Sequence, residues 1–121
     1  MISKVKAIYI HIPFCKTICS YCDFCKLFYN EKLVNSYLRK LEKEITDNYK
    51  GEEISTIYIG GGTPTSLSYD ELSFLFTIVK KIKLTNNYEF TIEANVESLD
   101  IDKIKLLKEN GVTRVSIGVE T

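Results

Sequence analysis

The sequence predicts an α/β fold in which parallel strands alternate with helices in the order βαβαβαβ. Short segments rich in β-branched and aromatic residues recur along the chain, and between them apolar residues recur at spacings of three and four. Strands joined through helices of this length run parallel, because each connection crosses over one face of the sheet. The 121 residues are 45% apolar and 26% charged, which is typical of a single globular domain.

The first strand is predicted at Ala7–Ile12 (AIYIHI), and it ends at Pro13, which has no N–H group for a strand ladder. The first helix is predicted at Glu31–Asn48, where one apolar stripe recurs at helical spacing. Asn30 is suited to cap the start of this helix, and Gly51 to mark its end.

The second strand is predicted at residues 54–59 (ISTIYI), and it runs into the glycine-rich segment 60–64 (GGGTP). Ser68 and Glu71 then form an S-x-x-E capping box, which predicts the start of a second helix. Apolar residues continue at helical spacing as far as Val79.

The third strand is predicted at residues 88–92 (YEFTI), and Glu-Ala-Asn follows it at 93–95. A third helix is predicted at about 99–110, with Gly111 as its stop signal. The fourth strand is predicted at 114–117 (RVSI).

The unusual motifs of the chain all follow these strands. They are a cysteine-rich segment, the GGGTP segment, the Glu-Ala-Asn segment and a final Gly-Val-Glu at 118–120. Ligands of parallel α/β sheets bind at the carboxyl ends of the strands. We therefore expect one site along one edge of the sheet.

All four cysteines lie in one short segment with the spacing C-x3-C-x2-C-x2-C, at Cys15, Cys19, Cys22 and Cys25. Such clustering cannot tie distant parts of the chain together, so it indicates metal binding or redox chemistry. Three interpretations compete. Structural zinc sites usually join two separated cysteine pairs, and a redox pair at Cys19 and Cys22 leaves Cys15 unexplained. Thiolates at short spacing also suit an iron–sulfur cluster.

The string at 15–22, with Tyr21 directly before the last of these cysteines, resembles the cluster motif of the radical S-adenosylmethionine enzymes. The longer strings YIHIPFC (9–15) and YCDF (21–24) resemble the oxygen-independent coproporphyrinogen oxidase group, and within it the haem-chaperone-like branch. The strings GGGTPT (60–65) and IEAN (92–95) follow in the matching order, so the resemblance runs from Tyr9 to the last residue.

This resemblance implies the first part of a partial (β/α)6 barrel. It also implies a [4Fe–4S] cluster held by Cys15, Cys19 and Cys22, with one iron left open for S-adenosylmethionine. The reduced cluster would split the carbon–sulfur bond of that cofactor. The residues implied to contact S-adenosylmethionine are Tyr9, Tyr21, Gly61, Gly62, Thr63 and Glu93.

Two positions depart from the family pattern. The porphyrinogen-oxidising members carry an extra cysteine two residues after the third ligand, whereas this chain has Phe24 there and Cys25 one residue later. This favours the chaperone-like branch, and Cys25 is expected to be a bystander thiol, with a ligand to a second metal or to haem as the alternative. Glu120 stands where the family often has glutamine, so a cofactor contact is not carried over to it. The lone histidine, His11, is expected to be structural.

The function predicted from this resemblance is therefore that of a radical S-adenosylmethionine protein that binds haem as a chaperone. Two alternatives remain: an oxygen-independent coproporphyrinogen III oxidase, and a plain iron–sulfur or zinc-binding module. The expected partners are a flavodoxin- or ferredoxin-like electron donor and haem or a porphyrinogen. Nucleic acid is not expected, because 16 basic residues balance 16 acidic ones. No apolar run is long enough to span a membrane, and a cytoplasmic protein is expected.

The length also limits what this chain can do alone. A barrel of eight units takes about 250 residues, so six units would need roughly 190. Residues 1–121 supply four strands and three helices in the predicted order. We therefore expect an incomplete, N-terminal part of a core domain, which would cleave S-adenosylmethionine only when completed by the remaining units.

Overall fold

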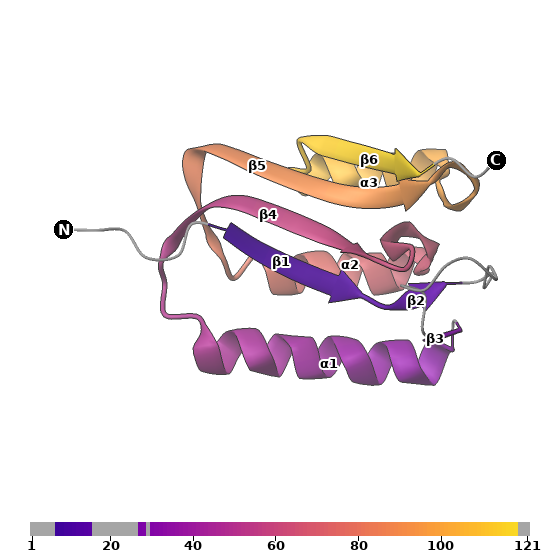
Figure 1. Ribbon diagram of the computed structural model, residues 1–121, viewed down its shortest axis with the longest axis horizontal. Coiled ribbons are helices and arrows are strands. Elements are labelled where there is room, and N and C mark those ends of the chain that lie inside the picture. Colours follow the sequence, from indigo (N-terminus) through magenta and orange to yellow (C-terminus); the bar gives the residue numbers. More distant parts are fainter. Residues whose placement is uncertain (1–6, 16–26, 29, 119–121) are drawn as a thin grey trace.

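The computed structural model describes residues 7–15, 27–28 and 30–118. Within these residues, four strands form one sheet in the order β1-β4-β5-β6 (Figure 1). The strands are β1 (Ala7–Ile12), β4 (Glu53–Gly61), β5 (Lys83–Asn95) and β6 (Arg114–Gly118). Every pairing between neighbours is parallel, which confirms the predicted α/β fold.

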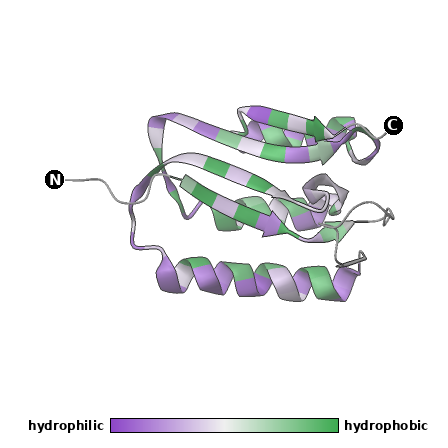
Figure 2. Ribbon diagram, viewed as in Figure 1, coloured by the Kyte–Doolittle hydropathy of each residue, from purple (hydrophilic) through white to green (hydrophobic). Residues whose placement is uncertain are grey.

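The helices α1 (Glu31–Asn48), α2 (Tyr69–Val79) and α3 (Ile101–Glu109) connect successive strands of the sheet. They lie along one side of it and leave the other face uncovered (Figure 1). Apolar residues alternate with polar ones along the strands, as Figure 2 shows. The side chains buried between sheet and helices include Ile10, Ile12, Ile57, Ile59, Phe90 and Ile92 from the strands, and Val34, Leu38, Leu72, Leu75, Phe76 and Leu106 from the helices.

Local signals start each helix. The Asn30 side chain accepts hydrogen bonds from the N–H groups of Lys32 and Leu33, so the predicted cap of α1 is confirmed. Ser68 and Glu71 form both hydrogen bonds of the predicted capping box at α2. These bonds use N–H groups that have no partner inside the helix.

The third strand is longer than predicted. It begins at Lys83 rather than at residue 88, because Lys83 and Leu84 pair with β4 before a register shift between Ile54 and Thr56. Residues 85–87 (TNN) are polar, and the two asparagines are exposed, so this stretch resembles a turn in the sequence. Long-range pairing on both sides of the shift overrides that local preference.

Two short strands were not predicted. Phe14–Cys15 (β2) pairs in parallel with Leu27–Phe28 (β3), directly after β1 and just before α1. Two short 3-10 helices, η1 (Pro64–Ser66) and η2 (Val96–Ser98), follow β4 and β5. All four elements therefore lie at the carboxyl edge of the sheet. No helix in the described part of the chain is long and apolar enough to cross a membrane.

Candidate functional site

Polar side chains gather on the face of the sheet that the helices leave uncovered, which we call the open face. The strand register aligns Tyr9 of β1 with Tyr58 of β4, and aligns Tyr58 with Thr91 of β5. Because side chains alternate along a strand, residues two positions further on reach the same face. The open face nearest the carboxyl edge is formed by Tyr9, His11, Tyr58, Gly60, Thr91, Glu93, Arg114 and Ser116.

Glu93 lies half-buried at the centre of this face. Its Oε2 accepts a hydrogen bond of 2.6 Å from the Tyr58 hydroxyl, and its Oε1 accepts one of 3.0 Å from the N–H of Gly61. No lysine, arginine or histidine in the described residues forms an ion pair with this carboxylate. Glu93 is thus held by two neutral donors from the neighbouring strand.

This arrangement makes the Tyr58 hydroxyl harder to deprotonate than an ordinary phenol. Donation to Glu93 raises the pKa of Tyr58 above its ordinary value, and burial and the negative charge of Glu93 raise it further. The Ser116 hydroxyl and the positive charge of Arg114 act on the pKa of Tyr58 in the opposite direction. At neutral pH the phenol therefore remains a hydrogen-bond donor.

Tyr9 lies beside this pair and exposes 58% of its surface. Its ring stacks on that of Tyr58, with 5.9 Å between ring centroids and 19° between ring planes. The Tyr9 hydroxyl also lies 3.1 Å from Nδ1 of His11. Burial and, to a smaller extent, the charge of Glu93 raise the pKa of Tyr9. Two residues predicted to bind the cofactor, Tyr9 and Glu93, therefore lie together on the open face.

Close packing explains why β4 ends in glycines. Gly61 adopts a φ of +122°, and a Cβ there would lie 2.6 Å from the backbone oxygen of Ile12. A Cβ on Gly60 would lie 2.8 Å from Oε1 of Glu93. Only residues without side chains let β4 approach both β1 and the Glu93 carboxylate this closely.

The N–H groups of this segment all bind within the protein. That of Gly61 donates to Glu93, that of Gly62 to the oxygen of Ile12 at 2.8 Å, and that of Thr63 to the oxygen of Phe14 at 2.9 Å. A ligand at this segment would therefore meet backbone carbonyl oxygens rather than free N–H groups. Such oxygens suit a ligand that itself donates hydrogen bonds.

Beyond the strand ends, hydrogen bonds join η1 to η2. The hydroxyls of Thr65 and Ser98 form a hydrogen bond with each other. Nζ of Lys103 donates to the backbone oxygen of Thr65 at 2.9 Å and to that of Ser98 at 3.3 Å. Asn95 caps η2 by accepting from the N–H of Glu97. Asn95 therefore has a structural role in fixing the carboxyl edge.

The structure places only part of the predicted metal site. Cys15 directly follows Phe14 in β2, and its backbone pairs with Phe28, so it lies just past the carboxyl end of β1. The predicted ligands Cys19 and Cys22 and the predicted cofactor contact Tyr21 lie outside the described residues, as do Cys25 and Glu120, to which no contact was assigned.

Sequence reasoning missed Tyr58. The signal was present, because in the segment ISTIYI the residues Ile57 and Ile59 are buried and Tyr58 between them must face the other side. What the sequence does not contain is the register that brings Tyr58 opposite Glu93.

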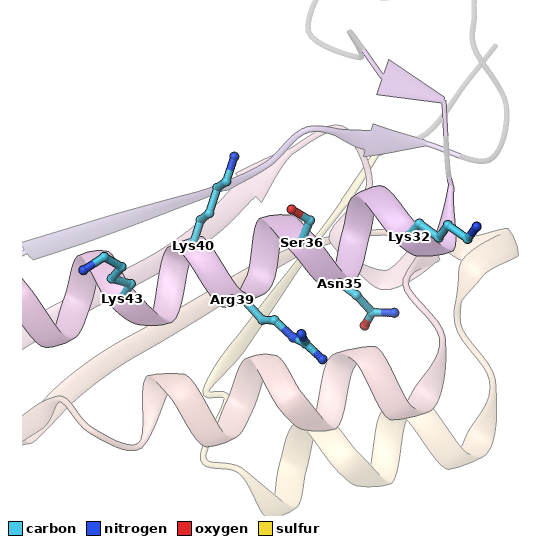
Figure 3. A pocket seen from close by; sticks show the side chains of 6 residues that line it. All are labelled: Lys32, Asn35, Ser36, Arg39, Lys40 and Lys43. Atoms are coloured by element: carbon cyan, nitrogen blue, oxygen red, sulfur yellow. The ribbon is translucent and has the colours of Figure 1, made fainter.

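A hollow of about 490 Å³ lies elsewhere, on α1 (Figure 3). Its lining comes from this helix alone: Lys32, Asn35, Ser36, Arg39, Lys40 and Lys43. Val34 and Leu38 face the core, so these side chains lie on the solvent side of α1. Lys43 forms an ion pair with Asp47 at 3.0 Å. This hollow shares no residue with the open face of the sheet.

The sequence pattern of the Radical SAM superfamily matches residues 9–121. The heme chaperone HemW of Bacillus subtilis is 45% identical, over 97% of this chain and 32% of the relative. The heme chaperone HemW of Lactococcus lactis is 42% identical, over 100% of this chain and 32% of the relative.

A solved structure has the same fold. It is that of coproporphyrinogen III oxidase (HemN) from Escherichia coli, described as a radical SAM enzyme, and it matches with a TM-score of 0.87 and 29% identity. The match covers 98% of this chain and 28% of that one. The chain thus spans about a third of the length of the relatives that it matches.

Proposed function

Because the chain belongs to the radical SAM superfamily, we propose that it binds a [4Fe–4S] cluster and S-adenosylmethionine at the carboxyl edge of its sheet. The superfamily is one of S-adenosylmethionine and iron–sulfur proteins. The single observation that carries the assignment to this edge is the Glu93 carboxylate, held by Tyr58 and Gly61 beside the exposed ring of Tyr9.

We propose Cys15, Cys19 and Cys22 as the cluster ligands. The position of Cys15 directly past β1 supports this, because it lies at the same sheet edge as Glu93. Three soft thiolates fit an iron–sulfur cluster and leave one iron without a protein ligand. When bound, the cluster would supply the electron that cleaves S-adenosylmethionine.

The residues at the sheet edge suit the chemical groups of S-adenosylmethionine. A carboxylate has about four acceptor positions, and Glu93 uses one on each oxygen, so one on each remains for the two ribose hydroxyls. The carbonyl oxygens of Gly61 and Gly62 would accept from the ammonium group of its methionine part. Thr63, whose own carbonyl oxygen already accepts from the N–H and the hydroxyl of Ser66, would lie beside that group. Tyr9 and Tyr21 would cover the site and exclude water.

Within the superfamily we place the protein in the coproporphyrinogen oxidase-like group, in its haem-chaperone-like branch. The Cys-Asp-Phe string at 22–24 and the two heme chaperone relatives support this choice. We propose haem as its cargo, a flavodoxin- or ferredoxin-like protein as its electron donor, and the cytoplasm as its location. An oxygen-independent coproporphyrinogen III oxidase is the second candidate, which the fold match to HemN favours.

We also propose that residues 1–121 are the N-terminal part of a longer core domain. The coverage of a third of each relative supports this, as does the apolar surface left on the last strand and helix. Val115 and Ile117 of β6 are 38% and 48% exposed, and Ile101 and Ile104 of α3 are 71% and 51% exposed. Further βα units of the barrel would cover them.

The experiment uses the complete reading frame, reconstituted anaerobically with iron and sulfide. We expect a bound cluster, binding of S-adenosylmethionine, and stoichiometric haem binding without turnover of coproporphyrinogen. Turnover without haem binding would select the oxidase instead. A reconstituted protein that binds neither iron nor S-adenosylmethionine would refute the whole proposal.

A further inference from the structure

We propose that Tyr58 is a positioning residue, whose hydroxyl turns the Glu93 carboxylate toward a vicinal diol. The inference rests on the proposed function and deepens it, because it names what prepares Glu93 for the ribose. Nothing in the sequence motifs assigns a role to Tyr58, which lies two residues before the glycine-rich segment.

The Glu93 carboxylate would be free to turn without its two hydrogen bonds. The last torsion of a glutamate side chain has broad and weak preferences, so an unrestrained carboxylate samples many orientations. Here the 2.6 Å bond from Tyr58 fixes Oε2 and the 3.0 Å bond from Gly61 fixes Oε1. The bond to Gly61 alone would hold one oxygen and leave the carboxylate free to turn about it.

The fixed carboxylate can still accept hydrogen bonds from a ligand. Each oxygen accepts one hydrogen bond and can accept one more, and all acceptor positions of a carboxylate lie in the plane of the group. Two adjacent hydroxyls can donate to such a pair at the same time. A lone hydroxyl can use only one of them, so the arrangement favours a diol over a single alcohol.

Tyr58 itself is held by a ring contact and by strand pairing. Its ring stacks on Tyr9 at 5.9 Å, and its position in β4 is set by pairing with both β1 and β5. Gly60 follows the register on the same face and provides the space for Glu93, since a Cβ there would lie 2.8 Å from Oε1 and 2.9 Å from the Tyr58 ring. The phenol is therefore placed before any ligand arrives.

The test compares Tyr58→Phe with the unmodified protein, using the complete, cluster-loaded chain. Affinities for S-adenosylmethionine and for its 2′-deoxy analogue are measured by equilibrium dialysis, so the readout is binding rather than turnover. A hydrogen bond to a charged group typically contributes a factor of about ten or more, so we expect about tenfold weaker binding of S-adenosylmethionine by the variant. Binding of the 2′-deoxy analogue should change by less than about twofold, because it offers no diol.

The control is Tyr88→Phe, which removes another strand-borne phenol. Tyr88 donates to the oxygen of Gly111 at 2.8 Å and does not contact Glu93. We expect this variant to bind both ligands as the unmodified protein does.

The possible outcomes distinguish a failure of the Tyr58 role from a failure of the proposed function. If Tyr58→Phe binds S-adenosylmethionine normally, or loses both ligands equally, the positioning role is wrong while the proposed function stands. If the unmodified protein binds neither ligand, the proposed function fails, and the role of Tyr58 fails with it.

Discussion

Glu93 shows at the residue scale how a carboxylate with no cationic partner among the described residues is kept in place. Its two hydrogen bonds come from a phenol and a backbone amide, both on the neighbouring strand. Neutral donors orient the charge without neutralising it, so the carboxylate remains available to a ligand. The same pair of bonds couples the ionisation of Tyr58 to the stability of the fold.

Tyr58 therefore predicts a pH dependence. Its pKa is raised in the folded state above the ordinary value of 10.0, first by donation to Glu93. A raised pKa means that the stabilisation is present below about pH 10 and is lost as the pH rises through the folded value. The difference in free energy of unfolding between the unmodified protein and Tyr58→Phe should be constant near neutrality and shrink in alkali. Urea unfolding across this range measures it, and a difference that grows above about pH 10 would refute the sign.

The cysteines give a second prediction at this scale. Cys15→Ala should lose bound iron after anaerobic reconstitution, because three thiolates are the fewest that the proposed cluster can use. Cys25→Ala is the matched control, because it makes the same substitution in the same cysteine segment. This variant should keep its bound iron and the absorbance of the cluster. Iron retained in full by the first variant would refute the ligand assignment. Iron lost from the second would make Cys25 a fourth cluster ligand and leave no iron open for S-adenosylmethionine.

At the scale of elements, the glycines ending β4 serve the contact between strands. Gly61 combines a positive φ with a Cβ position 2.6 Å from Ile12, whereas Gly51 has a positive φ and no atom within 4 Å of its Cβ position. Gly61→Ala should therefore lower the free energy of unfolding by about 3 kcal/mol or more. Gly51→Ala should lower it by about 1 kcal/mol. Urea unfolding of both variants checks the difference, and equal losses would contradict the packing argument.

The starts of α1 and α2 were predictable from the sequence because their signals are local, whereas α3 begins at Ile101 with Asp100 as a cap that was not predicted. Asn30 at α1, and Ser68 with Glu71 at α2, act within one turn of their own helix. The start of β5 at Lys83 was not predictable, because its polar residues 85–87 are held by pairing with β4 across a register shift. The pairing of β2 with β3 was missed for the same reason, since two residues carry no periodic pattern.

At the scale of the molecule, the parallel order brings separate motifs to one edge. The sequence was enough to predict that edge, because each motif follows a strand, and Tyr9 and Glu93 do lie together on the open face. It was not enough to identify Tyr58, whose role depends on the register between β4 and β5. The predicted ligand contacts of Gly61 and Gly62 stay predictions, and the packing of Gly60 and Gly61 adds a reason for glycine within the protein.

The last strand gives a prediction for the chain as a whole. Among the described strands β6 pairs with β5 alone, and Val115 and Ile117 leave apolar surface exposed. Exposed strand edges of this kind favour association with other chains. We expect residues 1–121 alone to self-associate in sedimentation experiments and to show no cleavage of S-adenosylmethionine above background, while the complete protein is well dispersed and active. A monomeric 121-residue chain with a sharp cooperative melt would contradict this.

The central claim is that Glu93 binds S-adenosylmethionine beside a cluster held by the cysteine segment. The most direct test is the affinity of the complete, cluster-loaded protein for S-adenosylmethionine before and after Glu93→Gln, with iron content measured in the same samples. Glutamine replaces one acceptor oxygen by an NH₂ donor, which would oppose the donors of Tyr58, Gly61 or the ribose. We predict unchanged iron and at least about tenfold weaker binding in the variant. Equal affinity at equal iron content would show that the open face is not where the cofactor binds.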